Sequence, residues 1–259
     1  MGILEGRVAI ITGASKGIGR AMSLYFAREG AKVICAARSE ALVKETVALI
    51  KAKAGDAVAV VADVSTEAGA RTTVDAAAAA FGRIDTLVNN AGDAGPTKPV
   101  QDYGSDDWAY TINSCLTSTY LCVRFAVPFI IAAGGGSIVN IASVAGRRGL
   151  AYRVGYCSAK AGQIGMTYGL ALELGRHNIT VNAIAPGAVE GDRIDRVVNE
   201  QASVRGIDVA RMRATFVERS PLRRMSTADD ISSLAAFLCS DHARNISGQC
   251  IPVTAGEPA

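Results

Sequence analysis

The sequence predicts an α/β fold in which an open parallel sheet lies between layers of helices. Short β-branched runs alternate with longer segments of helical pattern along the chain, which is typical of right-handed βαβ units. The short runs are continuously apolar, as expected for parallel strands that helices cover on both faces. Hydrophobic residues make up 49% of the 259 residues and aromatic residues only 5%, so Ala, Val, Ile and Leu must fill the core.

Seven runs are expected to form strands, because each is short, apolar and rich in Val, Ile or Thr. In chain order they are RVAIIT at 7–12, KVICAA at 32–37, AVAVVA at 57–62, IDTLVNN at 84–90, SIVNIAS at 137–143, ITVNAIAP at 179–186 and CIPVT at 250–254.

The longer segments between these runs are expected to be helices. They cover 18–29, 39–53, 66–81, 105–132, 155–175 and 227–239. No linker rich in Pro, Gly or Ser divides the chain, so we expect one domain over residues 1–259. The charged segment 188–221 breaks the alternation, and we expect an inserted loop there with one or two helices that cover the site.

The charge pattern does not favour a nucleic-acid partner. The net charge is +3, and the longest basic clusters are the pairs Arg147–Arg148 and Arg223–Arg224. Six cysteines without a CxxC pair, and a start without an apolar leader, predict a reduced cytoplasmic protein; no metal site is expected. The uncharged stretch 125–146 is interrupted by Pro128 and by the glycines at 134–136, so no membrane span is expected.

The first predicted strand runs into a glycine-rich turn, and a helix follows. The turn reads Thr12-Gly13-Ala14-Ser15-Lys16-Gly17-Ile18-Gly19. A helix N-terminus offers free N–H groups and the positive end of the helix dipole, and glycines let the backbone approach a pyrophosphate. A plain βα turn is the alternative, but its place after the first strand of an alternating chain favours dinucleotide binding.

Six short motifs stand in the order found in short-chain dehydrogenases/reductases, which the sequence resembles over nearly its whole length. They are TGASKGIG at 12–19, Asn89-Asn90-Ala91-Gly92, Asn113, Ser143, Tyr156-x-x-x-Lys160 and Pro186-Gly187. The resemblance is to the shorter single-domain branch, similar to the 3-oxoacyl-carrier-protein reductases. It implies a Rossmann-like, doubly wound parallel sheet of seven strands in a three-layer αβα arrangement, usually in a homotetramer.

Tyr156 and Lys160 lie four residues apart, so they share one face of the predicted helix. A tyrosine phenol is ordinarily protonated at neutral pH, and a lysine ammonium in a partly desolvated site favours the phenolate. Tyr156 can then exchange the substrate's hydroxyl proton while hydride moves to or from a nicotinamide. The resemblance implies that Lys160 also bonds the nicotinamide ribose, that Ser143 hydrogen-bonds the substrate oxygen, and that Asn113 holds a water linked to Lys160.

Each of these residues also has a plainer interpretation. A YxxxK pair is more often a surface pair, a serine after a strand is usually a turn former, and Asn113 could face solvent. Only their joint arrangement, with Ser143 thirteen residues before Tyr156, favours catalysis.

The resemblance also assigns residues to a cofactor site at the carboxyl ends of the strands. Asn89 is expected to line the cofactor and to steady the sheet. Asp63 and Val64 are expected to contact the adenine, although Asp63 could instead cap a helix. The complete cofactor set is Gly13, Ser15, Lys16, Gly17, Ile18, Gly19, Arg38, Asp63, Val64, Asn89, Ala91, Gly92, Tyr156, Lys160, Pro186, Gly187 and Val189.

The end of the second strand favours NADP(H) over the alternative, NAD(H). NAD-specific dinucleotide folds often place an acidic residue there, but this chain has Ala37, so nothing repels a 2′-phosphate. Arg38 follows at once, and the resemblance directs Lys16 to the same pocket. The alternative is that Arg38 merely begins the next helix and Lys16 is solvated.

Two features concern the substrate end of the site. Gly191 stands where related enzymes often have a threonine that bonds the nicotinamide amide, which puts that contact in doubt. Arg153 is expected to face the substrate, with Arg147 and Arg148 nearby, and could hold a carboxylate or phosphate. A cluster of arginines at a subunit contact is the alternative.

The sequence therefore predicts an NAD(P)(H)-dependent oxidoreductase that interconverts a secondary alcohol and a ketone of small size. A non-catalytic dinucleotide-sensing protein is one alternative, and the intact Ser143, Tyr156, Lys160 and Asn113 argue against it. An epimerase or dehydratase of the same family is another, and the chain lacks room for the extra substrate domain that those relatives generally carry.

Overall fold

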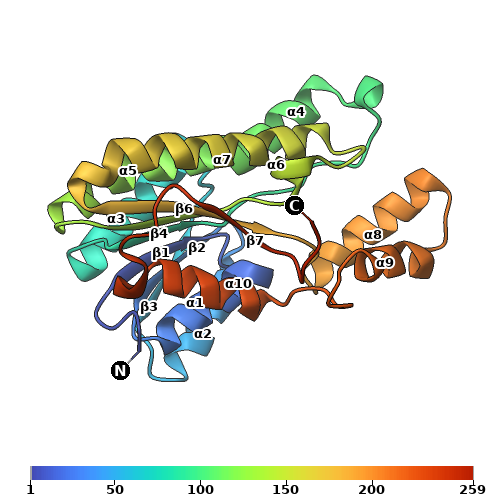
Figure 1. Ribbon diagram of the computed structural model, residues 1–259. Coiled ribbons are helices and arrows are strands. Elements are labelled where there is room, and N and C mark those ends of the chain that lie inside the picture. Colours follow the sequence, from blue (N-terminus) through green and yellow to red (C-terminus); the bar gives the residue numbers. More distant parts are fainter. Residues whose placement is uncertain (1, 259) are drawn as a thin grey trace.

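One seven-stranded parallel sheet forms the centre of the computed structural model, which describes residues 2–258 (Figure 1). The strands are β1 (Val8–Thr12), β2 (Lys32–Ala37), β3 (Ala57–Val61), β4 (Thr86–Asn89), β5 (Gly136–Ile141), β6 (Ile179–Pro186) and β7 (Cys250–Val253). Their order is β3-β2-β1-β4-β5-β6-β7, and all neighbours are parallel. The strand order therefore reverses between β1 and β4, and this doubly wound arrangement confirms the predicted fold class.

Helices cover both faces of the sheet (Figure 1). One layer contains α1 (Gly17–Arg28), α2 (Glu40–Lys51) and α10 (Ala228–Leu238), and the other contains α3 (Glu67–Phe81), α5 (Ser118–Ala132) and α7 (Val154–Leu174). Successive residues of a strand point to opposite layers: Ile11 packs with the first layer and Ile10 with the second, and both are fully buried. This two-sided burial explains why the strands are continuously apolar.

The predicted helix over 105–132 is divided into three parts. It begins as α4 (Ser105–Ile112), passes through a π-helical turn (Asn113–Thr117) and continues as α5. Single π-helical turns inside α-helices often occur at functional sites. By length and composition, the helix from Ser105 to Ala132 could cross a membrane, but 44% of its most apolar window is buried inside the protein. The apolar residues of α5 pack in the core cluster on one face of the sheet.

Two other regions differ from simple βα alternation. β5 ends at Ile141, which leaves Ser143 in the following loop, and a short helix α6 (Ala145–Arg148) that the sequence did not predict comes next. Residues 188–221 contain α8 (Asp192–Arg205) and α9 (Val209–Glu218), which pack on each other through a small apolar cluster of their own. Figure 1 shows these two helices projecting beyond the edge of the sheet. Short 3₁₀ turns occur at Val100–Asp102, Gly175–His177 and Asp241–Ala243.

Candidate active site

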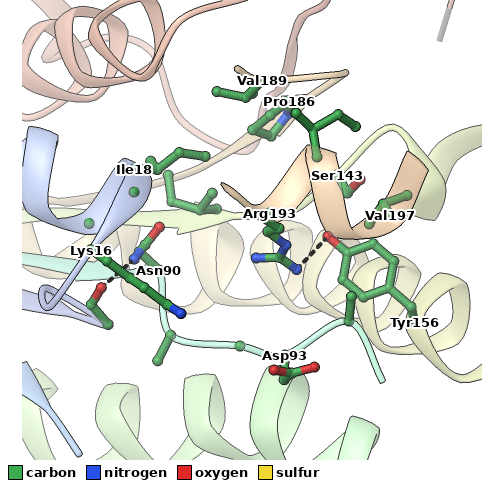
Figure 2. A pocket seen from close by; sticks show the side chains of 18 of the residues that line it. Lys16, Ile18, Asn90, Asp93, Ser143, Tyr156, Pro186, Val189, Arg193 and Val197 are labelled. Carbon is green, nitrogen blue, oxygen red and sulfur yellow. Dashed lines mark hydrogen bonds between the residues drawn. The ribbon is translucent and has the colours of Figure 1, made fainter. Parts of the chain in front are cut away.

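A cavity of about 750 Å³ opens where the carboxyl ends of the strands meet. It is lined by the segments that follow β1 to β6, by the first turns of α7 and by α8. In doubly wound sheets this is the edge where ligands bind, next to the point at which the strand order reverses. Figure 2 shows side chains from these segments converging on the cavity.

The glycine turn after β1 forms one wall of the cavity. Gly13 has a φ of 67°, a conformation that glycine adopts without strain. A Cβ atom on Gly19 would lie 2.1 Å from the carbonyl oxygen of Gly13, so no side chain fits there. α1 begins at Gly17, and its first N–H groups point toward the cavity end of the turn. The turn therefore has the close backbone approach and the free donors that a pyrophosphate needs.

Asn90 joins this turn to the end of β4. Its Nδ2 donates to the carbonyl oxygens of Thr12 at 2.9 Å and of Gly13 at 3.3 Å. The Thr12 hydroxyl oxygen accepts from the N–H groups of Asn90 and Ala91, each at 3.0 Å. These bonds fix the glycine turn against the neighbouring strand. The sequence analysis missed Asn90, although its place beside Asn89 at a strand end was a signal for it.

Asn89, which was expected to line the cofactor, does not line the cavity. Consecutive residues of a strand point to opposite faces, so only one of the two asparagines can reach the glycine turn. Asn89 is buried, and its Nδ2 donates to Oδ1 of Asn140 at 2.9 Å. Nδ2 of Asn140 in turn donates to the hydroxyl oxygen of Thr167 on α7 at 2.9 Å. Asn89 thus ties β4 to β5 and α7.

The remaining residues of the predicted cofactor set all line the cavity. They are Gly13, Ser15, Lys16, Gly17, Ile18, Gly19, Arg38, Asp63, Val64, Ala91, Gly92, Tyr156, Lys160, Pro186, Gly187 and Val189. Gly191 lines it too and, with a φ of 124°, precedes the first residue of α8.

Two exposed cations, Arg38 and Lys16, line the cavity. Neither Arg38 nor Lys16 has a carboxylate within ion-pair distance among residues 2–258. Burial raises the pKa of Asp63, but hydrogen bonds from Ser65 and the charge of Arg38 outweigh burial and hold that pKa below its usual value. Asp63 does not cap α3, because the N-cap there is Thr66, whose hydroxyl accepts from the helix backbone.

Ser143, Tyr156 and Lys160 meet at the other end of the cavity. Nζ of Lys160 lies 5.7 Å from the centroid of the Tyr156 ring, so the two side chains share one face of α7 as expected. The Ser143 hydroxyl oxygen accepts from the N–H of Ala145 at 3.1 Å, and this bond leaves the hydroxyl proton free to donate. Ser143 is nearly buried at the cavity wall, as Figure 2 shows beside Tyr156.

Lys160 is only 3% exposed and its ammonium is held by fixed acceptors. Nζ donates to the carbonyl oxygen of Ile141 at 2.7 Å and to Oε1 of Gln163 at 2.7 Å. The sequence analysis did not single out Gln163, because a glutamine inside an apolar helix carries no known motif.

Asn113 does not join this group, which corrects the prediction for it. Asn113 is exposed, does not line the cavity and accepts a hydrogen bond from the Thr117 hydroxyl at 3.0 Å. The π-helical turn reaches the neighbour of Lys160 through its backbone instead: the carbonyl oxygen of Cys115 accepts from Nε2 of Gln163 at 3.0 Å.

The two arginines near Tyr156 differ in how their charge is matched. Arg153 is 3% exposed; its Nη1 donates to the Thr97 hydroxyl at 2.7 Å and lies 3.4 Å from a carboxylate oxygen of Glu200. Burial lowers the pKa of Arg153, and the charge of Tyr156 and Glu200 opposes that effect. Arg153 is thus already held by the protein.

Arg193, at the start of α8, points into the cavity toward Tyr156 (Figure 2). Its Nη2 lies 3.4 Å from the Tyr156 oxygen, and the charge of Tyr156 raises the pKa of Arg193. Within residues 2–258 no carboxylate oxygen lies within 4 Å of its guanidinium. Arg153 also lines the cavity, but its guanidinium is paired with Glu200, whereas Arg193 has no such ion pair within residues 2–258.

The geometry defines a class of protein. A glycine turn that fits a pyrophosphate, in one cavity with a tyrosine, a buried lysine and a serine, is suited to a nicotinamide-dependent oxidoreductase.

Comparison with known proteins gives the family. A family model described as Enoyl-(Acyl carrier protein) reductase matches residues 13–257. The 3-oxoacyl-[acyl-carrier-protein] reductase of Thermotoga maritima is 36% identical over 257 residues, which are 98% of each chain. The solved structure of NAD⁺-bound xylitol dehydrogenase has a TM-score of 0.94 at 33% identity, covering 98% of this chain and 99% of that one. Carveol dehydrogenase from Mycobacterium avium in complex with NAD has a TM-score of 0.94 at 30% identity, covering 99% of both chains.

The chain belongs to the short-chain dehydrogenase/reductase family, as its motifs predicted. It is an oxidoreductase that uses a nicotinamide dinucleotide to interconvert alcohols and ketones. The relatives match it over nearly their whole length, so neither a non-catalytic sensor nor an epimerase with an added domain is favoured.

A prediction follows from the packing of the glycine turn. Gly19→Ala places a Cβ against the Gly13 carbonyl, so the turn must shift away from the pyrophosphate position. We expect the dissociation constant of the nicotinamide cofactor to rise at least about tenfold by isothermal titration calorimetry. Gly165→Ala, on an open and exposed part of α7, is the matched control and should leave the constant unchanged. Unchanged cofactor binding in Gly19→Ala would contradict the assignment of the turn.

Proposed function

We propose that the protein is an NADP(H)-preferring enzyme that interconverts a small secondary alcohol and its ketone, with Ser143, Tyr156 and Lys160 as catalytic residues. The observation that carries this proposal is that the three side chains share one cavity with the glycine turn. The residues of the cavity fit a nicotinamide dinucleotide, which supplies or accepts the hydride when it is bound.

Each of the three residues has a distinct task. Tyr156 gives a proton to the substrate oxygen during reduction and takes one during oxidation. Ser143 donates its hydroxyl proton to the same oxygen, where negative charge develops. The fixed ammonium of Lys160 favours the phenolate of Tyr156 by its charge, and its proximity to the cavity suits it to bind the nicotinamide ribose.

The proposal predicts that Tyr156→Phe abolishes turnover and keeps cofactor binding, because only the hydroxyl group moves the proton. We expect the turnover number to fall at least about 100-fold, measured by the absorbance of the reduced nicotinamide across a panel of alcohols and ketones. Retention of most of the wild-type rate would show that another group transfers the proton. Tyr110→Phe, at an exposed tyrosine of α4, is the control and should keep the full rate.

NADP(H) is proposed over NAD(H) because Ala37, at the end of β2, carries no carboxylate that would repel a 2′-phosphate, and Arg38 follows it directly. Arg38 and Lys16 both line the cavity and have no ion-pair partner within residues 2–258. Solved structures of related enzymes are described with NAD or NADH. The comparison supports a nicotinamide dinucleotide as the cofactor. The two cations support NADP(H), the form that carries a 2′-phosphate.

Arg38→Ala tests this preference. The variant should lose about tenfold or more in the ratio of NADPH to NADH affinity, since a charged hydrogen bond to phosphate contributes about 1.5–3 kcal/mol. Dissociation constants for both cofactors measure it. Arg28→Ala, at an exposed arginine in the last turn of α1, should leave the ratio unchanged. Equal affinities in the wild type, or an unchanged ratio in Arg38→Ala, would disprove the preference.

We propose further that the substrate carries a carboxylate or phosphate, held by Arg193 rather than by Arg153, the residue that the sequence analysis weighed for this role against a subunit contact. Arg193 has no carboxylate within 4 Å among residues 2–258 and points at the reacting tyrosine. A guanidinium binds a carboxylate through two parallel hydrogen bonds.

Arg193→Met should therefore lower kcat/KM for acidic hydroxy or keto compounds about tenfold or more relative to neutral ones of similar size. Arg205→Met, at the exposed far end of α8, is the control. If neutral ketones are turned over far better than acidic ones by the wild type, the acidic substrate is excluded.

Assembly and location are proposals as well. Apolar and aromatic side chains are exposed on α5 and α7, among them Tyr120, Ile131, Tyr168 and Leu172, the last at 88% exposure. Such surfaces favour self-association, and a homotetramer is the assembly that the family resemblance suggests. We expect light scattering to give the tetramer mass at micromolar concentration.

A cytoplasmic location is proposed on the unpaired, mostly buried cysteines.

A further inference from the structure

Gln163 lies directly behind the catalytic lysine, one turn along α7 and away from the cavity. Its side chain is 0% exposed, and it does not line the cavity. Oε1 accepts from Nζ of Lys160 at 2.7 Å, while Nε2 donates to the carbonyl oxygen of Cys115 at 3.0 Å and to the Thr119 hydroxyl oxygen at 2.6 Å. All polar atoms of this fully buried amide are therefore engaged.

The partner on the other helix is a backbone carbonyl in the π-helical turn. Ser118 N–H donates to the carbonyl oxygen of Asn113, five residues back, so the helix is widened at this turn. In the widened turn the Cys115 carbonyl accepts from the side chains of Thr119, at 2.9 Å, and Gln163. The π-helical turn thus presents a buried acceptor to α7, and Gln163 is the residue that uses it.

The ammonium of Lys160 has three N–H donors, and the protein uses two of them. The Ile141 carbonyl takes one and Gln163 Oε1 the other, so the third is left for the cavity. A buried ammonium without such acceptors pays a large desolvation cost. Within residues 2–258 no carboxylate lies within ion-pair distance of Lys160, so neutral carbonyl oxygens hold its charge without cancelling it.

We propose that Gln163 is the positioning residue of this active site. It links Lys160 to the π-helical turn and fixes the direction of the one free N–H donor toward cofactor and substrate. It takes the linking role that the sequence analysis gave to Asn113, which faces away. Gln163 touches neither substrate nor cofactor, so it acts only through Lys160. The inference rests on the proposed roles of Lys160 and Tyr156.

Gln163 also sets the charge that Tyr156 experiences. Three cationic side chains lie against the Tyr156 ring: Lys160 on α7, Arg153 immediately before α7, and Arg193 on α8. An uncharged amide behind Lys160 leaves this positive field intact. A carboxylate at the same position would offset the ammonium and disfavour the phenolate of Tyr156.

Two variants of Gln163 distinguish the effect of positioning the Lys160 ammonium from the effect of changing the charge near it. Gln163→Leu removes all three side-chain hydrogen bonds of Gln163, and Gln163→Glu keeps the side-chain volume and the acceptor for Lys160 but adds a negative charge. Thr167→Val is the structural control, because Thr167 is fully buried one turn further along α7 and its hydroxyl bonds Asn140 and the backbone carbonyl of Gln163 rather than Lys160. Thermal unfolding of each variant, measured with cofactor bound, reports on folding independently of activity.

Steady-state kinetics with any ketone or alcohol that the wild type accepts provide the decisive measurement. Gln163→Leu should lower kcat about tenfold or more while KM for the substrate stays within about threefold. Gln163→Glu should move the rise of the oxidation rate with pH about one unit or more toward alkaline pH, because a more alkaline solution is then needed to form the phenolate. Thr167→Val should keep the wild-type pH profile even if its stability falls.

The inference is overturned if both Gln163 variants keep the wild-type kcat and pH profile, or if Thr167→Val reproduces their kinetic changes. Failure of the proposed function gives a different result. If Tyr156→Phe retains the wild-type rate, Tyr156 is not the acid/base, and neither the proposed role of Lys160 nor that of Gln163 holds. When Tyr156→Phe is inactive and the Gln163 variants behave as wild type, only the positioning role is wrong.

Discussion

The buried ammonium of Lys160 is the constraint around which the active site is arranged. A charge that is only 3% exposed needs fixed acceptors, and here two acceptors, and the group that holds one of them, come from three different elements. The end of β5 supplies the carbonyl of Ile141, α7 supplies Gln163, and the π-helical turn before α5 supplies the carbonyl that holds Gln163. Because Tyr156 lies one turn before Lys160, the same contacts determine where the acid/base faces the cavity.

The sheet provides the frame for these contacts. All its strands are parallel, so their carboxyl ends meet at one edge, and each strand delivers a different part of the site to that edge. β1 brings the glycine turn, β4 brings Asn90, which fastens that turn, and β5 brings Ser143 in the loop that follows it. α8 closes the open side and carries Arg193. A break in the Asn90 contacts would therefore disturb the cofactor wall without touching the catalytic residues.

Much of this architecture could be predicted from the sequence. Strands covered on both faces must be continuously apolar, which made all seven recognisable, and the four-residue spacing of Tyr156 and Lys160 indicated a shared helix face. The glycine turn was recognisable because its backbone geometry excludes side chains at Gly19.

The rest of the site depends on the directions in which particular side chains and carbonyl groups point, and a single sequence does not reveal those directions. The π-helical turn has no sequence signature, and it presents the Cys115 carbonyl to Gln163, while Asn113 is exposed and does not line the cavity. Asn89 and Asn90 are chemically identical neighbours, and only the pleat of β4 determines which one reaches the glycine turn. The approach of Arg193 to Tyr156 depends on the orientation of α8, which local pattern does not specify.

The most direct test of this account is the rate of hydride transfer in Lys160→Met at saturating cofactor. Reduced cofactor is mixed with an excess of enzyme and an accepted ketone, and the loss of reduced-nicotinamide absorbance is followed through a single turnover. The account predicts that the wild type transfers hydride and that Lys160→Met, although folded and loaded with cofactor, does so at least about 100-fold more slowly. A wild-type rate in the cofactor-saturated variant would contradict it.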